Sequence, residues 1–368
     1  MNKRIIFCVT NDLNYDQRMH RICSTLQTEG YAVELVGRKL KNSKQLEKQT
    51  FSQKRLRCIF NKGKLFYLEI NFRLFFYLLF SDASIFVAND IDTILAVYFA
   101  SILKNKKRVF DAHELFSEVP ELAERPMSKA VWRWLEKMMI PRYKTKYTVS
   151  ESIAKYYLEI YQQQFNVIRN VPLYKKTIEF NNDSNIILYQ GALNDGRGLA
   201  QMIDAMQEVH DFVLWIAGRG DIEEELKNQV KEMQLENKIK FLGVLSPLEL
   251  ESITINAKIG INLLENKGLN YYYSLANKFF DYMQVGIPTI NMAFPEYIKI
   301  NKEYETTILI DDLSKDSILE AVNKLRDKQF YQQLQLNCNK AKEVYTWENE
   351  SKKLIEIYDS LKVKEIRI

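Results

Sequence analysis

Short apolar runs alternate with longer amphipathic segments along the first 150 residues. The run KRIIFCVT is typical of a buried strand, and the segment DQRMHRICSTLQTEG that follows is typical of a helix ending at Gly30. Four apolar residues repeat on one face of that helix: Met19, Ile22, Cys23 and Leu26. Further strands are expected at YAVELVGR, ASIFVAND, KRVFDAHE and KYTVSES. Strands that alternate with helices predict a parallel sheet with helices on both faces.

The pattern then starts again after a polar stretch. We interpret VIRNVPLYKK with the following IEFNNDSN as a linker. Five more strands are expected behind it: NIILYQG, FVLWIAGRGD, IKFLGVL, AKIGINLL and GIPTINM. The segment TWENESKKLIEIYDSLK is expected to be a helix. The predicted fold class is α/β, with two Rossmann-like βαβ domains at residues 1–170 and 171–345 facing each other across a cleft, where ligands are expected.

Composition supports this division and limits the partners. A chain of 368 residues with 46% hydrophobic and 27% charged residues is globular and long enough for two domains. The net charge of +5 is not gathered in one long tail, so it favours phosphates or anionic lipid only weakly, and we expect no nucleic-acid partner. The four cysteines form no CxxC pair, which predicts neither disulfides nor zinc and fits a reducing cytoplasm.

No membrane-spanning or signal segment is expected. The apolar run near the N-terminus, Ile5–Thr10, is too short for a signal peptide. The most apolar long window, Lys64–Phe80, is interrupted by Glu69 and Arg73, and it is shorter than the ~20 apolar residues that span a bilayer.

Polar residues follow several strands of the first predicted sheet, at the carboxyl ends where ligands of such sheets bind. His113 is one of three histidines, and Asp111 and Glu114 flank it. A structural histidine and a functional polar cluster both remain open interpretations. Asp90-Ile91-Asp92 has a DxD pattern, for which a loop is favoured over a metal site.

Two glycine-rich stretches follow strands of the second domain. In YQGALNDGRGLAQMIDAM, Gly191, Gly196 and Gly198 let the backbone approach a ligand, and Arg197 suits phosphate oxygens. In IAGRGD, Gly218 has the same capacity. The alternative for both stretches is that the glycines serve only a tight turn.

The stretch GLNYYYSLANKFFDYMQVGIP places charged residues among aromatic ones. A helix from about Leu275 to Met283 is expected to bury Phe279, Tyr282 and Met283. Its polar surface carries Asn277, Lys278 and Asp281, with Ser274 near its start. That surface suits a diphosphate and a ribose diol. The alternative is a solvated ion pair between Lys278 and Asp281.

These motifs resemble those of the family 4 retaining glycosyltransferases, which have the GT-B fold. SLANKFFDYMQVGIPTI is similar to the bacterial pattern S-L-P-N-K-L-F-E-Y-M-x-x-G-x-P-V-I, with Ala276 in place of the proline. The first glycine-rich stretch is similar to G-R-x-x-x-x-K-G, whose basic pair grips the donor pyrophosphate. Arg197 occupies the second basic position, whereas Ala192 occupies the first. Tyr273 stands where the family keeps the first glutamate of its Glu-x₇-Glu signature, and Glu265 or Glu296 is a candidate replacement.

The resemblance implies an activity and a division of labour. Residues 1–170 would bind the acceptor, with the helix of residues 346–368 crossing back to them, and residues 171–345 would bind a UDP- or GDP-linked sugar. The sugar would pass with retention to a hydroxyl of a glycan or lipid-linked acceptor, as in bacterial cell-surface polysaccharide or glycolipid assembly. Two alternatives stay open: a nucleotide-sugar 2-epimerase of this fold, and a non-catalytic partner in glycan assembly.

The resemblance also implies residue roles. Arg197 and Lys278 would neutralise the diphosphate, Asp281 would bind the ribose, and His113 would contact the transferred sugar. The other donor-binding candidates are Gly191, Gly198, Gly218, Ser274 and Asn277. The acceptor-side candidates are Asn11, Asp16, Asn89, Asp90 and Glu114. No metal or other cofactor is expected, because basic residues and helix N-termini would take the role of a metal.

The basic, aromatic stretch Lys62–Phe80 has two interpretations. It is either a core helix under the sheet or a surface for peripheral contact with the inner membrane. The predicted location is cytoplasmic in both cases.

Overall fold

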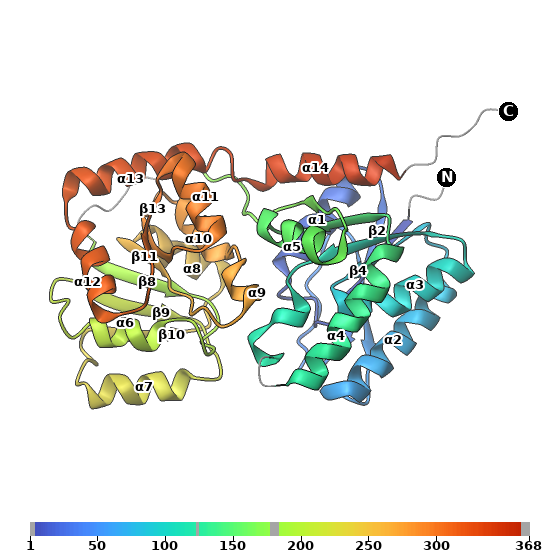
Figure 1. Cartoon of the computed structure of the whole chain (residues 1–368), viewed down its shortest axis with the longest axis horizontal. Helices are drawn as coiled ribbons and strands as arrows, with labels where there is room; N and C mark the ends of the chain where they lie inside the picture. Colours follow the sequence, from blue (N-terminus) through green and yellow to red (C-terminus); the bar gives the residue numbers. More distant parts are fainter. Residues whose placement is uncertain (1–3, 123–124, 177–183, 362–368) are drawn as a thin grey trace. The chain divides into compact units, whose positions relative to one another are not determined.

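The chain forms two compact units. The computed structural model describes residues 4–122, 125–176 and 184–361, and most of the polar stretch IEFNNDSN lies outside these ranges. The first unit comprises Met1–Asn170 with Glu350–Ile368, and the second comprises Val171–Asn349 (Figure 1).

The sheet of the first unit has seven strands in the order β3-β2-β1-β4-β5-β6-β7. All its neighbouring strands run parallel. The strands are β1 (Arg4–Cys8), β2 (Ala32–Lys39), β3 (Ser52–Arg57), β4 (Ile85–Asn89), β5 (Lys107–Ala112), β6 (Thr145–Thr148) and β7 (Asn166–Val167). Ile5 of β1 pairs with Val33 on one side and with Ile85 on the other. The chain order therefore reverses at β1, and ligands of such sheets bind beside that reversal.

Helices cover this sheet. They are α1 (Gln17–Thr28), α2 (Gly63–Leu79), α3 (Ile94–Leu103), α4 (Pro126–Met139) and α5 (Glu151–Tyr161), with short 3₁₀ turns at Ile91–Thr93, Phe116–Glu118, Pro120–Leu122 and Ile140–Arg142. Asp16 caps α1, because its side chain accepts a hydrogen bond from the Met19 amide. The four residues predicted on the apolar face of α1 are buried.

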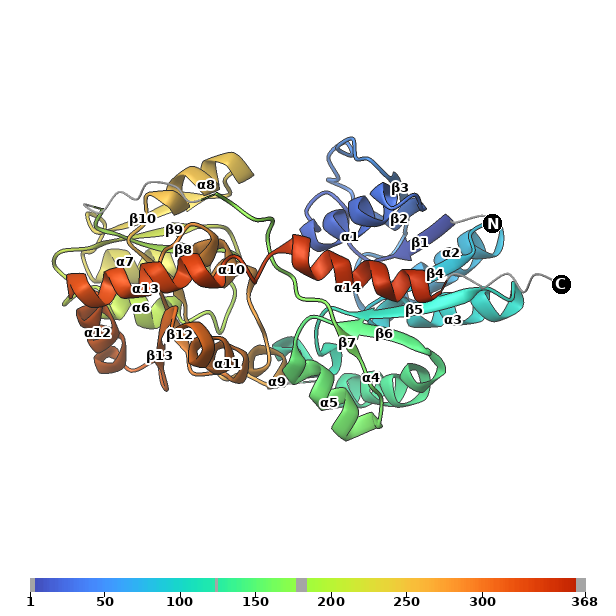
Figure 2. The same cartoon turned by 90° about the horizontal axis from the view of Figure 1, so that it is seen from above.

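The helix α14 (Trp347–Ser360) contributes to the first unit from Glu350 onward. Its Tyr358 ring lies 6.1 Å from the Phe7 ring, and its hydroxyl is hydrogen-bonded to that of Tyr147 at 3.2 Å. Figure 2 shows this part of α14 along the sheet of the first unit. Leu354 and Tyr358 are fully buried there, so this helix completes the core of the unit.

The second unit repeats the architecture with six parallel strands in the order β10-β9-β8-β11-β12-β13. The strands are β8 (Ile186–Gln190), β9 (Val213–Ala217), β10 (Ile239–Gly243), β11 (Ile259–Asn262), β12 (Thr289–Met292) and β13 (Thr307–Ile310). The helices are α6 (Leu199–Ala205), α7 (Glu223–Glu232), α8 (Pro247–Ile255), α9 (Leu269–Tyr272), α10 (Asn277–Gln284), α11 (Pro295–Tyr304), α12 (Lys315–Lys324) and α13 (Lys328–Ala341). Here the strand order reverses at β8.

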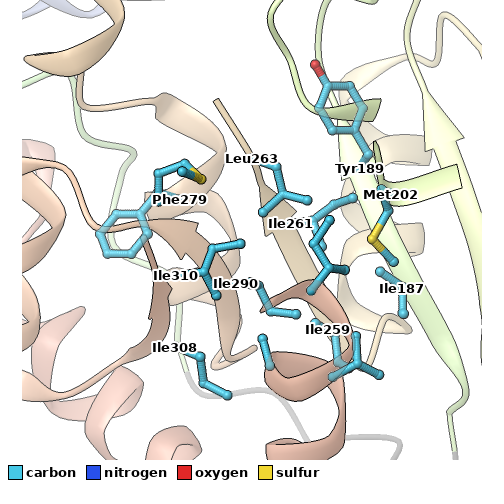
Figure 3. Packing of buried hydrophobic residues seen from close by; sticks show 14 of the residues in the cluster. Ile187, Tyr189, Met202, Ile259, Ile261, Leu263, Phe279, Ile290, Ile308 and Ile310 are labelled. Carbon is cyan, nitrogen blue, oxygen red and sulfur yellow. The ribbon is translucent and has the colours of Figure 1, made fainter. Parts of the chain in front are cut away.

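The core of the second unit shows why β8 is a strand. Ile187 and Tyr189 point into the larger apolar cluster, shown in Figure 3, whereas Leu188 points into a smaller cluster with Tyr282. Alternation with a period of two places successive side chains on opposite faces of a sheet. Phe279, Tyr282 and Met283 of α10 are buried as predicted.

Three strands were missed by the sequence analysis. The edge strand β3 has the mostly polar sequence SQKRLR and leaves several side chains exposed, so it presents no apolar run. The edge strand β7 has only two residues. Strand β13 contains only three apolar residues, which is too short a run to separate from a loop.

Candidate functional site

Lys278 lies at the carboxyl end of β8, where the order of the second sheet reverses. Its Nζ is 3.6 Å from the centroid of the Tyr189 ring. A Cβ atom on Gly191, the residue that follows β8, would lie 3.2 Å from the same Nζ. Glycine at position 191 therefore leaves room for the amine over the aromatic ring.

Arg197 brings a second positive charge to Lys278. The Lys278 side chain is partly exposed, but burial of its amine lowers the pKa well below the usual value. The charge of Arg197 lowers this pKa further, and the charge of Asp281 acts in the opposite direction. The Nε atom of Arg197 is buried without a hydrogen-bond partner, and its guanidinium carbon lies 4.8 Å from the centroid of the Tyr271 ring. In the described part of the chain neither cation has a carboxylate partner, so the pair suits an anion.

Asp281 is hydrogen-bonded at the end of β8. Its Oδ2 accepts a hydrogen bond of 3.1 Å from Nε2 of Gln190, and Oε1 of Gln190 accepts one of 2.9 Å from Thr254. The described residues contain no ion pair between Lys278 and Asp281. The interpretation of these two residues as a solvated ion pair is therefore wrong.

The start of α10 has no side-chain cap. The capping position is Ala276, whose own amide donates to the Tyr297 hydroxyl at 2.9 Å. Asn277 is exposed at the first helical position, and the Ser274 hydroxyl donates to the Tyr271 carbonyl at 2.8 Å. The first amides of an uncapped helix attract anions. Lys278, in this first turn, adds its amine.

Packing explains two of the glycines. A Cβ atom at Gly218 would lie 1.8 Å from the Gly191 carbonyl oxygen, and one at Gly198 would lie 2.7 Å from the Leu263 carbonyl oxygen. These two glycines let backbone segments touch, which is the turn interpretation. Among the predicted donor-binding glycines, Gly191 is the one whose missing side chain makes room for a charged group.

The candidates for the absent glutamate lie in different settings. Glu265 follows β11, pairs with Lys267 at 2.9 Å, and its amide donates to the Gly196 carbonyl at 2.9 Å. It therefore adjoins the glycine-rich loop. Glu296 is buried in the first turn of α11, and Tyr273 is half-buried beside Tyr272.

In the first unit, His113 belongs to a buried charge network after β5. Its Nε2 lies 2.9 Å from Oδ2 of Asp111, while Arg18 donates to Oδ1 of Asp111 at 3.0 Å. Asn89 also donates to Oδ2, at 3.2 Å. Sequence analysis did not select Arg18, because it lies on α1, 93 residues from Asp111, and no local pattern links the two.

Asp90 and Asp92 adjoin this network. Asp90 accepts a hydrogen bond of 2.7 Å from the His113 amide and has the unusual backbone angle φ of 59°. Burial raises the pKa of Asp90 to about 8 and that of Asp92 to about 7. Thr10 donates to Asp92 at 2.6 Å. Asp90 thus directly follows β4, and Asp92 contacts Thr10 just after the end of β1.

The remaining acceptor-side candidates separate into two groups. Asn89, Asp90 and His113 come together, and Glu114 is close enough for its charge to raise the pKa of Asp90. Asn11 and Asp16 instead lie in the loop before α1, where the side-chain amide of Asn11 donates a hydrogen bond of 2.6 Å to the Asp16 carboxylate.

Within the ranges 4–122, 125–176 and 184–361, no group of three or more His, Cys, Asp or Glu residues is placed to hold a metal ion. In the same ranges, no helix has both the length and the apolar character needed to cross a membrane.

Comparison with known proteins points to one family. Residues 170–344, slightly less than half of the chain, match the family model of glycosyl transferases group 1. An uncharacterized glycosyltransferase of Methanocaldococcus jannaschii is 24% identical over 192 residues, a match that covers 50% of this chain and 47% of that protein. The chain thus spans about half the length of this relative.

Solved structures resemble the whole chain. Sucrose-phosphate synthase from Thermosynechococcus elongatus has a TM-score of 0.82 at 16% identity, covering 97% of this chain and 98% of its own. HepE of Anabaena, solved with UDP and glucose, has a TM-score of 0.74 at 13% identity, covering 97% and 99%. These likenesses confirm the predicted two-domain GT-B fold. The match to glycosyl transferases group 1 falls on the unit that contains Arg197, Lys278 and Asp281.

Proposed function

We propose that the protein is a retaining glycosyltransferase of the family 4 type, which moves a sugar from a UDP- or GDP-linked donor to an acceptor hydroxyl. The observation that carries this proposal is that Arg197 and Lys278 lie close together and have no carboxylate partner in the described residues. Lys278 lies in the first turn of α10, which has no side-chain cap. The match of residues 170–344 to glycosyl transferases group 1 supports it.

The donor diphosphate would lie between these groups. Arg197, Lys278 and the first amides of α10 would stabilise the negative charge that grows on the leaving diphosphate. Such electrostatic stabilisation is in most enzymes the largest single contribution to catalysis. Asp281 would accept hydrogen bonds from the ribose. The protein needs no metal in this scheme, and the leaving diphosphate itself would accept the proton of the acceptor hydroxyl.

The acceptor would bind to the first unit, near Asn89, Asp90 and His113. These side chains gather at the carboxyl ends of β4 and β5, where ligands of parallel sheets bind. His113 would contact the transferred sugar. The acceptor class that we propose is a glycan or a lipid-linked glycan, as in cell-surface polysaccharide or glycolipid assembly.

The helix α2 supports a lipid-linked acceptor, because it is apolar on two opposite faces. Phe66, Ile70, Leu74 and Leu78 are buried, whereas the opposite stripe is exposed. The exposed stripe consists of Leu65 (55% exposed), Leu68 (68%), Phe72 (65%) and Phe76 (38%), and Phe80 (82%) follows it. Helix α2 packs against α3 (Figure 1). Helix α3 adds three exposed apolar side chains, those of Phe99, Ile102 and Leu103. An exposed apolar surface of this kind marks a membrane or protein contact.

The charge beside α2 favours a membrane. Residues 38–64 contain ten Lys and Arg residues but one acidic residue, Glu47, in a chain whose total net charge is +5. A groove of about 730 Å³ next to the stripe is lined by Phe72, Phe76 and Phe80. Three arginines (Arg4, Arg57 and Arg73) and two acidic residues (Glu69 and Asp82) complete its charged lining. Basic residues next to exposed aromatic side chains suit anionic lipid. We therefore propose peripheral contact with the cytoplasmic face of the membrane, and a cytoplasmic location.

Vesicle flotation tests the membrane contact. The wild-type protein should float with phosphatidylglycerol vesicles and much less with phosphatidylcholine vesicles, and added salt should release it. The double variant Phe72→Ser, Phe76→Ser should stay unbound, whereas Leu248→Ser, which changes an exposed leucine of the second unit, should float normally. Absence of the wild-type protein from both vesicle fractions would refute this contact.

Incubation with nucleotide-sugars tests the reaction. A thermal-shift screen of nucleotide diphosphates and nucleotide-sugars would first identify the donor. Transfer of the labelled sugar to a glycan or lipid-linked acceptor with an unchanged anomeric configuration is expected. An epimerised sugar formed without an acceptor would support the epimerase alternative, and no binding of any donor would support a non-catalytic partner.

A further inference from the structure

The carboxylate of Asp111 is fully occupied by three donors from different elements. Arg18 of α1 donates to Oδ1, while Asn89 of β4 and Nε2 of His113 share Oδ2. Asp111 is fully buried and Arg18 is 4% exposed. A buried carboxylate with this set of donors stays ionised, and the Arg18 charge lowers its pKa accordingly.

This arrangement fixes one nitrogen of His113 as a donor. Oδ2 of the ionised Asp111 can only accept, so Nε2 of His113, 2.9 Å away, carries a proton. The side-chain amide nitrogen of Asn89 also lies 3.2 Å from Nε2, but it donates to the same Oδ2 and cannot accept the Nε2 proton. The other nitrogen, Nδ1, lies 3.8 Å from the Asp90 carboxylate, which is beyond hydrogen-bond distance. Nδ1 is therefore the ring atom whose protonation state decides what His113 can do.

We infer that Asp111, whose carboxylate Arg18 holds in place, is a positioning residue that keeps His113 an imidazolium, so that Nδ1 presents an N–H donor to the ligand. This inference rests on the proposed function, in which His113 contacts the transferred sugar. An imidazolium donates hydrogen bonds but accepts no proton. His113 would then bind a sugar oxygen and would not be the base that activates the acceptor hydroxyl.

The charges around His113 support this state. Among the described residues, three charged groups act on it: Arg18 from α1, Asp90 after β4 and Asp111 on β5. Glu114, the next residue in the chain, raises the pKa of Asp90. Burial alone would lower the pKa of His113, but the carboxylates of Asp111 and Asp90 outweigh burial and the opposing Arg18 charge, and they raise it to about 9.

Proton NMR titration of the histidine rings tests the inference without any turnover. The chain has three histidines, and His113→Asn identifies the His113 signal by its loss. In the wild-type protein the His113 ring should remain protonated at pH 7.5. Asp111→Asn should lower the pKa of His113 by more than about one pH unit, since it removes the nearest negative charge. Arg18→Gln should move that pKa upward, since it removes a positive charge. The His210 signal, from the second unit, is the internal control.

The opposite directions separate positioning from simple structural support. A loosened site would bring His113 toward the ordinary value of ~6.5 in both variants. If Asp111→Asn does not fold, Asp90→Asn replaces it and should also lower the pKa of His113. A wild-type His113 that is neutral at pH 7.5, or a downward change in Arg18→Gln, would overturn the inference. Because the titration needs no donor or acceptor, its failure would leave the proposed transfer untouched.

Discussion

The amine of Lys278 lies 3.6 Å from the centroid of the Tyr189 ring, although Asp281 stands one turn further along the same helix. An aromatic ring attracts a cation without cancelling its charge, whereas an ion pair with a carboxylate would cancel it. Arg197 is close enough to lower the pKa of Lys278. The second unit thus keeps two adjacent basic groups, neither paired with a carboxylate in the described residues, at the end of β8.

This relationship predicts proton uptake when a nucleoside diphosphate binds. Burial and Arg197 lower the pKa of Lys278, and a bound diphosphate should raise it again by stabilising the ammonium form. Calorimetry of UDP or GDP binding in buffers of different ionisation enthalpy should show proton uptake that is greatest between the lowered pKa of Lys278 in the free protein and the ordinary lysine value of ~10.4, and smaller outside that window. Lys278→Arg, which stays charged, should bind without uptake. Uptake that persists in this variant would assign the proton to another group.

The same depressed pKa has a consequence for stability. A lysine with a lowered pKa in the folded state binds fewer protons than in the unfolded state, so folding stability should rise with pH between the two values. In Lys278→Met, the free energy of unfolding measured by urea denaturation should depend less on pH over this range. An identical pH profile in both proteins would contradict the burial of this charge.

Asp281→Ala should abolish donor binding, because the carboxylate is the proposed ribose acceptor. Asp281→Asn is the matched control, since it keeps an oxygen for Gln190 but loses the charge. A hydrogen bond to a charged group contributes ~1.5–3 kcal/mol, so Asn should weaken nucleotide binding about tenfold or more. Fluorescence or calorimetric titration measures both. Unchanged affinity in the alanine variant would refute the assignment.

Two glycines should respond differently to alanine. Gly218→Ala should destabilise the fold by more than about 2 kcal/mol, because its Cβ would lie 1.8 Å from the Gly191 carbonyl oxygen. Gly191→Ala should cost about 1 kcal/mol of stability for its positive φ, but it should weaken nucleotide binding by displacing the Lys278 amine. Chemical denaturation and nucleotide titration together check this order. Equal stability of the two variants would contradict it.

Asp90 should show backbone strain. A non-glycine residue at φ 59° and ψ 169° costs ~1–3 kcal/mol, and such strain concentrates at functional sites. Both Asp90→Gly and Asp90→Ala lose the hydrogen bond to the His113 amide, but only glycine also relieves the strain. Asp90→Gly should therefore be the more stable of the two in urea denaturation. Equal stability would show that this conformation carries no strain.

Sequence patterns were informative where a single element determines the outcome. The period of two in β8 and the buried face of α10 follow from local alternation, so the α/β fold and the position of Lys278 could be predicted. Strand β3 could not, because its pairing with β2 does not depend on apolar side chains.

The partners of the site residues depend on tertiary packing and left no local signal. The stack of Lys278 on Tyr189 joins α10 to β8, and the ion pair of Arg18 with Asp111 joins α1 to β5. Spacing alone left open an ion pair between Lys278 and Asp281, which shares its helix turn. In the described part of the structure, Lys278 contacts Tyr189 at the end of β8 and forms no ion pair with Asp281 on its own helix.

The central claim is that Arg197 and Lys278 form a diphosphate site. Isothermal titration calorimetry of UDP and GDP against the wild-type protein, Arg197→Met and Lys278→Met tests it most directly. At least one nucleotide should bind the wild-type protein, and each methionine variant should lose most of that affinity while its thermal unfolding stays cooperative. Absence of binding by either nucleotide, or affinity that is unchanged in both variants, would contradict the claim.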